Sequence, residues 1–583
     1  MDPFLAAIVT LLQEVVQAAA PAGVAVPEIQ AGLIEQPPDP ALGDYAFPCF
    51  QLAKALRKGP PLIAKDLAAR LQPALARQPL LTGVEAAGPY VNFRASIPEM
   101  ARGAVPAILS GAYFEANRGA RRAKVMIEYS QPNTHKAFHV GHMRNVALGD
   151  ALVRIFEYNG HPVIAANYIG DVGTHIAKCL WYYQKHRTEE PPAEGRGEWL
   201  GKLYTAATLM LEQAAPEEQA RMEKEVSAVL QQLEARQGEP YRLWQETRQW
   251  SLQAFDEIYR WLGARFDHVF YESDMEAGRK IVDEGLRRGV FVRSQGAVGI
   301  DLEAYKLGFF LVLKADGTTL YATKDLALAQ IKFEQFQIDE SIYVVGAEQT
   351  LHFQQVFKAL ELLGYPQARQ CHHLSYGLVM LPEGKMSSRA GNIITFSRLR
   401  AEMNAYIDTH YLGAHRGEWS EEEIAETARR IAVAAIRYGM VKQDPSKAIV
   451  FAMADWLETE GDTGTYLCYA YTRIQSMLRL VGRAGRPDVD YTLLTQEPEK
   501  RLIRLLHDFN RVVEQAEQTL RPNHLANSLF DICKEFSRAY ATSPVLKAET
   551  PALADARLAL FAATGQLLER GLFLIGIVPP SRM

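Results

Sequence analysis

The first part of the chain combines a helical and an extended pattern. Apolar side chains recur with helical spacing over residues 3–20, which predicts an amphipathic helix. The turn QPPDPALGDYAF follows, and a second helix is expected to start near Cys49. GVEAAGPYVNFR alternates apolar and polar positions, which predicts a strand. Residues 1–115 are therefore expected to form a separate α+β unit.

A different pattern begins at RRAKVMIEYSQPN. The continuous apolar run Val125–Tyr129 is typical of a buried parallel strand. A loop and a helix over about 141–158 follow, and HPVIAANYIGD predicts a second strand. This order is the start of a doubly wound α/β fold, in which ligands bind at the carboxyl ends of the strands.

The chain then becomes polar and helical from about 175 to 265, which we interpret as an insertion between the halves of the sheet. Strand patterns return at GAVGIDL, FFLVLKADGTTLYAT, SIYVVGAEQ and HHLSYGLVML. The remainder is nearly all helical. We predict an N-terminal domain of residues 1–115, a Rossmann-like α/β domain of residues 116–410, and a helical domain of residues 411–583.

Composition narrows the class of protein. The 583 residues carry a net charge of −5, so a nucleic-acid partner would have to meet local basic patches. The five cysteines are dispersed without a CxxC pair, which favours a reducing compartment. The first helix has an acidic start and is interrupted by Gln13, Glu14 and Gln17, unlike a signal peptide. No apolar run is long enough to span a bilayer, so we expect a cytoplasmic protein without a membrane partner.

The segment HVGH, residues 139–142, falls where the first strand passes into the first long helix. Its spacing differs from the HExxH of zinc helices and no third ligand is evident, so we expect no metal here. Two interpretations stay open: the histidines are a pair of core residues, or they form a phosphate-binding site. Gly141 would let a ligand approach the helix N-terminus, where the helix dipole favours negative charge and His139 and His142 could donate hydrogen bonds.

A second segment supports the interpretation of HVGH as a phosphate-binding site. LPEGKMSSRAGN, residues 381–392, is a glycine-bounded loop in which Lys385 could bind pyrophosphate. Without the HVGH segment, we would interpret residues 381–392 as a solvated surface loop. HxGH at the first strand–helix turn, with KMSS after the last strands, resembles the class I aminoacyl-tRNA synthetases. IEYSQPN, LYATKDLALA, VVGAEQTLHF, TEGDTGTYLCYAYTRIQSML and FLIGIVPPSRM together resemble the arginyl-tRNA synthetases over the whole chain.

The resemblance implies an enzyme that ligates L-arginine to tRNA(Arg) through an arginyl adenylate, with ATP as substrate and Mg²⁺ bound to it. In the family, the residues that match Glu128, Tyr321 and Asp325 hold the guanidinium, and those that match Asn133 and Gln349 hold the amino-acid end. Ser130 lies in the same pocket wall. Tyr321 and Asp325 are spaced i, i+4, which places them on one face of a helix. The alternative for Asp325 is an exposed helix charge.

The resemblance also assigns the ATP site, with catalysis by positioning and by stabilisation of phosphate charge. The residues assigned to it are His139, Gly141, His142, Lys385, Ser387 and Ser388. Ser388 stands where many class I enzymes have the second lysine of KMSKS. Arginyl enzymes that lack this lysine often carry one before HxGH, and Lys136 occupies that place. We predict that Lys136 substitutes for it; the alternative is a surface lysine.

The helical C-terminal part matches the anticodon-binding domain of the family, and the N-terminal unit matches its extra domain, which contacts the tRNA elbow. YLCYAYTRIQSMLRLVGRAGR combines tyrosines and arginines without an acidic residue, a composition suited to single-stranded RNA. The residues singled out for tRNA binding are Tyr466, Arg473, Arg479 and Arg483. Tyrosines in a helical bundle are also often core residues. Family members typically activate arginine only with tRNA bound.

Three alternatives differ from this interpretation. The first alternative is a different HxGH nucleotidylyltransferase, which adenylates a small phosphorylated metabolite. Such enzymes are usually a single small domain, so the long helical C-terminal part would be unexplained. A non-catalytic tRNA-binding relative would be expected to lose residues that are intact here, among them Glu128, Asp325 and Lys385. A class I synthetase for another amino acid fits less well, because the pocket candidates include two acidic residues and no large editing insertion is present. The oligomeric state is expected to be monomeric.

Overall fold

The computed structural model describes residues 2–21, 24–37, 39–115, 122–275, 278–315, 320–385 and 393–583, and of Pro40 and Lys385 the backbone alone. The chain divides into two compact units. Unit 1 comprises Met1–Tyr113, Leu478–Phe509 and Lys534–Leu567, and unit 2 comprises Phe114–Met477, Asn510–Cys533 and Leu568–Met583. Helices of the last hundred residues therefore contribute to both units, and each unit is described by itself.

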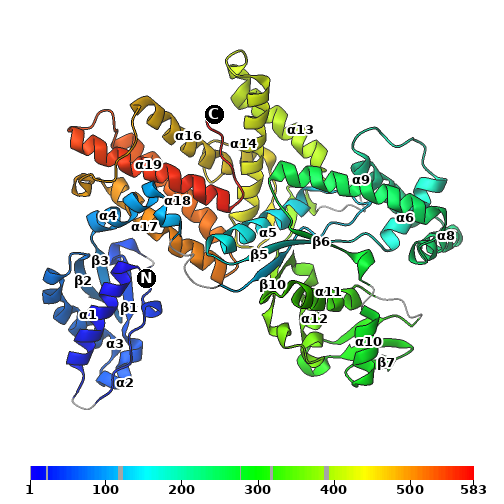
Figure 1. The fold of residues 1–583 in the computed structure, drawn as a ribbon, viewed down its shortest axis with the longest axis horizontal. Coiled ribbons are helices and arrows are strands. Elements are labelled where there is room, and N and C mark those ends of the chain that lie inside the picture. Colours follow the sequence, from blue (N-terminus) through cyan, green and yellow to red (C-terminus); the bar gives the residue numbers. More distant parts are fainter. Residues whose placement is uncertain are drawn as a thin grey trace. The chain divides into compact units, whose positions relative to one another are not determined.

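The N-terminal part of unit 1 is a small α+β layer, drawn in blue in Figure 1. Its three-stranded antiparallel sheet has the order β1-β3-β2, and α1 and α3 pack beside each other. The elements are α1 (Pro3–Ala19), β1 (Tyr45–Pro48), α2 (Ala53–Leu56), α3 (Pro60–Leu71), β2 (Leu81–Ala87), β3 (Tyr90–Ala95) and α4 (Ile97–Ser110). The predicted first helix is confirmed, and its apolar stripe, which includes Ile8 and Leu12, is buried.

One prediction in this region was wrong. GVEAAGPYVNFR is a hairpin of β2 and β3 instead of one strand, because Gly88 adopts a φ of 57° and Pro89 follows it, which reverses the chain. A helical segment does begin at Cys49, as predicted. It is short, a 3₁₀ turn followed by the one-turn helix α2, and the long helix α3 begins at Pro60.

The centre of unit 2 is a five-stranded parallel sheet with the order β11-β10-β4-β5-β6. Its strands are β4 (Val125–Glu128), β5 (Val163–Ile169), β6 (His268–Tyr271), β10 (Glu340–Gly346) and β11 (Cys371–Tyr376). The chain leaves β4 in one direction through β5 and β6 and returns on its other side through β10. This reversal makes the gap between β4 and β10 the topological switch point, where a doubly wound sheet binds its ligand. The predicted fold class is confirmed.

The helical insertion consists of α6 (Thr174–Lys185), α7 (Arg196–Gln213), α8 (Pro216–Glu234) and α9 (Gly238–Leu262). Its helical character is as expected, but its place in the sheet was predicted wrongly. The insertion lies between β5 and β6, inside one half of the sheet. The prediction placed it wrongly because the four-residue edge strand β6 was not recognised in the sequence. Figure 1 shows α6, α8 and α9 as one group of helices and α10, α11 and α12 as another.

A second, antiparallel sheet follows, formed by β7 (Val292–Ser294), β8 (Ala297–Asp301) and β9 (Phe309–Leu313), with α10 (Gly278–Arg287) before it. GAVGIDL and FFLVL belong to this sheet and not to the central one, whereas LYAT is the start of α11 (Tyr321–Phe336). The next elements are α12 (Thr350–Leu362), β12 (Val379–Leu381), β13 (Gly384–Lys385), α13 (Phe396–Ile407), α14 (Glu421–Val441), β14 (Ile449–Val450) and α15 (Met453–Leu457). The helices α16 (Gly464–Val481), α17 (Glu497–Gln518), α18 (Asn523–Thr542) and α19 (Pro551–Leu574) confirm the helical C-terminal part. None of the described helices combines the length and apolarity needed to cross a membrane.

Helix α5 (Val140–Tyr158) is buried on nearly all sides. At Gly149 a Cβ atom would lie 2.2 Å from the Tyr129 ring, so glycine lets this helix pack against the residue that follows β4. At the next position, Asp150 is 2.8 Å from Nη1 of Arg437 on α14, and both side chains are at most 1% exposed. Arg437 also donates from Nε to the carbonyl of Leu262 at 2.9 Å, which ties α14 to the end of α9.

This buried pair yields a stability prediction. Asp150→Ala leaves the Arg437 guanidinium buried without its carboxylate, and it should lower the free energy of unfolding by about 3–5 kcal/mol. All seven tryptophans lie in unit 2, so urea unfolding followed by tryptophan fluorescence reports on the correct unit. The control is Glu402→Ala, which removes an exposed partner of Arg398 and should cost less than about 1 kcal/mol. Equal losses in the two variants would contradict the prediction.

Candidate active site

The HVGH turn forms the N-terminus of α5, and its two histidines cap that helix. The amide of Gly141 donates to Nδ1 of His139 at 3.1 Å, and the amide of His139 donates to Nδ1 of His142 at 3.2 Å. Because both Nδ1 atoms accept, the ring proton of each neutral histidine is assigned to Nε2. Burial lowers the pKa of His139 to about 4 and that of His142 well below its usual value. Two neutral imidazoles therefore keep Nε2–H donors next to the helix N-terminus.

The loop between β4 and this turn is held in an unusual conformation. Ser130, Gln131 and His135 all have positive φ, at 75°, 47° and 62°. Asn145 on α5 fixes the loop, because its Oδ1 accepts from the Ser130 amide at 2.6 Å and its Nδ2 donates to the Val344 carbonyl at 2.9 Å. Non-glycine residues with positive φ are uncommon and concentrate at functional sites. The loop is thus tied to α5 on one side and to β10 on the other.

The predicted pyrophosphate loop is only partly described. Ser387 and Ser388 lie outside the described residues, and so does the side chain of Lys385. The chain that leaves this loop is well defined, because the amide of Val140 donates to the carbonyl of Ile394 at 3.1 Å. Thr395 pairs with His139 in an isolated β-bridge. Ile394 and Thr395 therefore lie beside the HVGH turn, although they are far from it in sequence.

Four carboxylates gather near the carboxyl ends of β4, β5 and β6 and on the adjoining α11. Each has a basic partner. Glu128 is 2.6 Å from Nζ of Lys332, Asp171 is 2.7 Å from Nε of Arg248, Glu272 is 2.7 Å from Nζ of Lys324, and Asp325 is 2.6 Å from Nε2 of His352. Lys332 is fully buried, and its Nζ also lies 3.7 Å from the centre of the Tyr343 ring.

The hydroxyl of Tyr168 on β5 marks the middle of this cluster. Burial, and then the negative charges of all four carboxylates, raise its pKa well above the usual value. Within the described part of the chain this buried hydroxyl has no hydrogen-bond partner. Burial likewise raises the pKa of Glu272 and of Tyr321. The negative charges of Glu272 and Asp325 raise the pKa of Tyr321 further. We call this cluster of four carboxylates around the Tyr168 hydroxyl the acidic recess, and its negative charges suit a cationic ligand.

The remaining predicted pocket residues lie on the same edge of the sheet. Tyr321 and Asp325 share the first turns of α11, as their spacing predicted. Asn133 pairs with Gly170 after β5, where a Cβ atom would lie 2.4 Å from the Asn133 side chain. Gln349 ends the short turn after β10. The Ser130 hydroxyl is 2.7 Å from the Tyr259 hydroxyl on α9, so its side chain holds the pocket wall instead of facing the recess.

Several residues of the recess were not singled out from sequence. Glu272 and Asp171 follow strands, and this position is the signal that could have identified them, but β6 itself was not recognised. Lys332 and His352 have the pattern of ordinary helix residues. Their burial depends on packing between distant segments, which composition and spacing do not encode.

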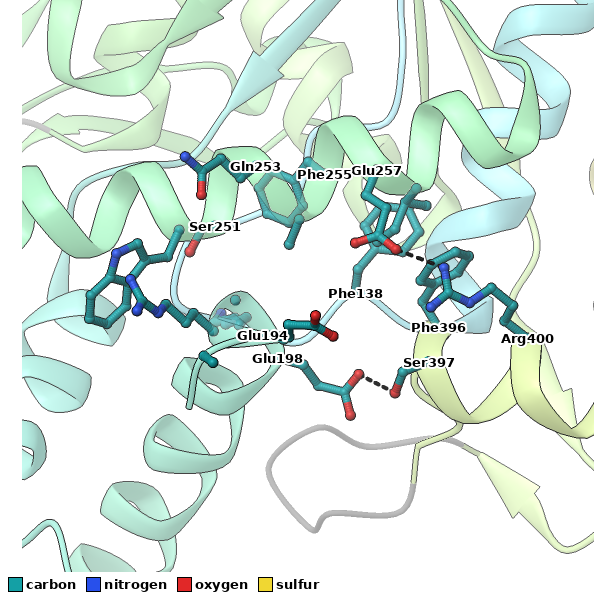
Figure 2. A pocket seen from close by; sticks show the side chains of 18 residues that line it. Phe138, Glu194, Glu198, Ser251, Gln253, Phe255, Glu257, Phe396, Ser397 and Arg400 are labelled. Atoms are coloured by element: carbon teal, nitrogen blue, oxygen red, sulfur yellow. Dashed lines mark hydrogen bonds and ion pairs between the residues drawn. The ribbon is translucent and has the colours of Figure 1, made fainter. Parts of the chain in front are cut away.

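A cavity of about 740 Å³ lies beside the residues that precede the HVGH turn. Figure 2 shows its walls: Phe138, the start of α7, the second half of α9, and the start of α13. Two contacts join the walls, Arg400 Nη1 to Glu257 at 2.7 Å and Ser397 Oγ to Glu198 at 2.5 Å. Lys136 also lines this cavity, and its Nζ is 5.2 Å from the centre of the Tyr204 ring.

The residues predicted to bind tRNA are distributed along α16 and the turn after it. Tyr466 packs into the helical bundle, with its ring 5.7 Å from that of Phe530 and its hydroxyl 3.4 Å from the Cys533 carbonyl. This matches the core alternative for that tyrosine. Arg473 is half-buried and Arg479 is exposed. Arg483 is exposed and forms an ion pair with Asp555 of the same unit.

Comparison with known families accounts for nearly the whole chain. The family described as "tRNA synthetases class I (R), catalytic domain" matches residues 104–453. The "Arginyl tRNA synthetase N terminal domain" matches residues 7–95. The "DALR anticodon binding domain" matches residues 467–583. The three matches follow one another along the chain in the order expected from its sequence.

Individual proteins agree with this result. The arginine–tRNA ligase of Bdellovibrio bacteriovorus is 43% identical over 550 residues, which cover 94% of this chain and 93% of that protein. The arginine–tRNA ligase of Clostridioides difficile is 34% identical over the full length of both chains. Among solved structures, Thermus thermophilus arginyl-tRNA synthetase superposes with a TM-score of 0.81 at 29% identity and covers 99% of this chain and all of its own. The chain therefore belongs to the arginyl-tRNA synthetases, a family of class I aminoacyl-tRNA synthetases.

Proposed function

We propose that the protein ligates L-arginine to tRNA(Arg) at the expense of ATP. In the first step an oxygen of the arginine carboxylate attacks the α-phosphate of ATP, and pyrophosphate leaves. In the second step a ribose hydroxyl of the terminal tRNA adenosine attacks the carbonyl of the arginyl adenylate, and AMP leaves. The observation that carries this proposal is the acidic recess around Tyr168, which lies on the same sheet edge as the HVGH turn.

The recess would hold the arginine. We assign the guanidinium to Asp325, Tyr321 and Glu128, and the amino-acid end to Asn133 and Gln349. A guanidinium offers five N–H donors in a plane, which several carboxylate and hydroxyl acceptors can satisfy together. The compact ammonium of lysine would leave some of these acceptors unpaired, at a cost of about 1–3 kcal/mol for each. Ser130 would support the wall through its contact with Tyr259.

The HVGH turn would hold the phosphates of ATP. His139 and His142 are neutral and present Nε2–H donors, so they can stabilise charge on phosphate oxygens without giving up a proton. Gly141 would leave room for the nucleotide next to the helix N-terminus. Lys385, Ser387 and Ser388 would bind the pyrophosphate portion, and Mg²⁺ would arrive with ATP.

The tRNA would contact several parts of the chain. Its 3′ end must reach the adenylate, and the cavity of Figure 2 supports an approach beside Phe138 because it adjoins the HVGH turn and contains aromatic and basic side chains. We assign anticodon contacts to Arg473, Arg479 and Arg483. The N-terminal α+β layer would contact the tRNA elbow. We place the protein in the cytoplasm, where reducing conditions fit the five cysteines, all buried as free thiols, and we expect a monomer.

A charging assay tests the function directly. Purified protein, total tRNA, ATP and Mg²⁺ are incubated with each of a panel of amino acids, and aminoacyl-tRNA is measured. Charging with arginine alone is the expected result. Charging with a different amino acid would reassign the substrate, and folded protein that charges none would favour a non-catalytic relative. ATP–pyrophosphate exchange with and without tRNA then shows whether arginine activation requires bound tRNA, as we expect.

The first site prediction concerns Asp325. Asp325→Asn keeps the shape of the side chain but removes its charge, and kcat/KM for arginine should fall about 30- to 1,000-fold, which corresponds to about 2–4 kcal/mol. The control is Glu334→Gln, an exposed carboxylate on the same helix, which should stay within twofold of wild type. Steady-state charging at varied arginine measures both. An unchanged kcat/KM in Asp325→Asn would remove this residue from the pocket.

The second site prediction concerns Lys136, which we propose replaces the absent second lysine of the pyrophosphate loop. Lys136→Ala should lower kcat of ATP–pyrophosphate exchange about 10- to 100-fold and leave the KM for arginine within threefold, since its charge would act on the leaving phosphates. Lys136→Arg should recover part of the rate. Lys202→Ala removes an exposed lysine of α7 and serves as the control. A rise in arginine KM with unchanged kcat would argue against the assignment.

A further inference from the structure

The charges of the acidic recess do not cancel. Glu128, Asp171 and Glu272 are each matched by a permanent cation, Lys332, Arg248 and Lys324 respectively. Asp325 has only an imidazole as its basic partner among the described residues, that of His352 at 2.6 Å. With His352 neutral, the four carboxylates and three cations around Tyr168 leave a net charge of −1. One bound guanidinium would bring the recess to neutrality.

Exposure points to the same carboxylate. The side chains of Glu128, Asp171 and Glu272 are 4%, 0% and 5% exposed, whereas that of Asp325 is 20% exposed. His352 is 23% exposed. The unmatched charge is therefore also the most accessible of the four, while the matched carboxylates are confined by their cations. Burying a carboxylate without a positively charged partner is costly, so the three matched pairs are stable without a ligand. Asp325 is the carboxylate that a bound cationic ligand would stabilise most.

We propose that His352 is a positioning and specificity-determining residue, which in its neutral form holds Asp325 for the guanidinium and in its protonated form competes with the substrate. This inference rests on the proposed function. A neutral His352 must donate from Nε2, because the carboxylate can only accept. That hydrogen bond fixes Oδ2 of Asp325 and leaves Oδ1 for the substrate. A protonated His352 supplies the missing positive charge itself, and the recess then no longer attracts a cation.

The surroundings of the Asp325–His352 pair contain few other groups that titrate near neutrality. The tyrosines Tyr168, Tyr321 and Tyr343 face it from β5, α11 and β10, and burial raises the pKa of each, so they stay neutral. Burial lowers the pKa of His373 on β11, which favours the neutral form of that ring. The negative charge of Asp325 helps to raise the pKa of Glu272, but Lys324 forms an ion pair with Glu272. On the β9 side the neighbour is the Phe310 ring, 5.9 Å from the imidazole.

Protonation of His352 would add a positive charge beside Asp325, so the proposal predicts a pH effect of definite sign. In wild-type charging at saturating ATP and tRNA, the KM for arginine should rise at least fivefold from pH 8 to pH 6. The kcat at saturating arginine should change by less than twofold over the same range, because enough substrate displaces the proton.

Two substitutions separate this role from a structural one. His352→Gln keeps a neutral donor to Asp325, so KM should lose its dependence on pH and remain near the wild-type value at pH 8. His352→Lys installs a permanent cation, so KM should be at least tenfold higher at every pH while kcat at saturating arginine is retained. His372→Gln, an exposed histidine on the neighbouring strand, should keep the wild-type profile.

The outcomes are distinct. A KM that is flat with pH in wild type, an unchanged pH profile in His352→Gln, or a wild-type KM in His352→Lys would each overturn the role of His352 while the proposed function stands. Folded wild-type protein that fails to charge tRNA at saturating arginine at any pH would overturn the proposed function and this inference together.

Discussion

Glu128, Asp171 and Glu272 can be buried at one edge of a sheet only if positive charge is buried with them, and this constraint shapes the active-site half of the protein. The desolvation of a carboxylate costs several kcal/mol unless a partner compensates it. Here the partners come from distant segments: Lys332 and Lys324 from α11, and Arg248 from the helical insertion. The pairs therefore bind these elements to the sheet edge as well as shaping the recess.

The other half of the site follows the opposite rule. The two histidines of the HVGH turn are neutral, since burial lowers the pKa of each, and their Nδ1 atoms cap the helix. An anion at this turn meets N–H dipoles and the helix N-terminus. A cationic amino-acid side chain and an anionic nucleotide thus receive environments of opposite character on one sheet edge. The carboxylate of the first and the α-phosphate of the second would meet between them.

The sequence allowed the local features to be predicted and left the long-range ones open. Tyr321 and Asp325 were expected on one face because helical spacing is a local property, and the HVGH turn was expected at a helix N-terminus for the same reason. The edge strand β6 was missed because four residues without alternation carry little signal, and this hid Glu272. Lys332 reads as a surface residue in sequence, and only the packing of α11 against β4 and β10 buries it. The hairpin at Gly88 and Pro89 could have been recognised from its turn residues.

The most direct test of the account compares arginine with citrulline, which has nearly the same shape but a neutral ureido group in place of the guanidinium. Both are assayed as substrates of the wild-type protein by ATP–pyrophosphate exchange in the presence of tRNA. If one unmatched negative charge selects the substrate, kcat/KM for citrulline should be at least about 1,000-fold lower than for arginine. A ratio within about tenfold would contradict the account, because shape alone would then explain recognition.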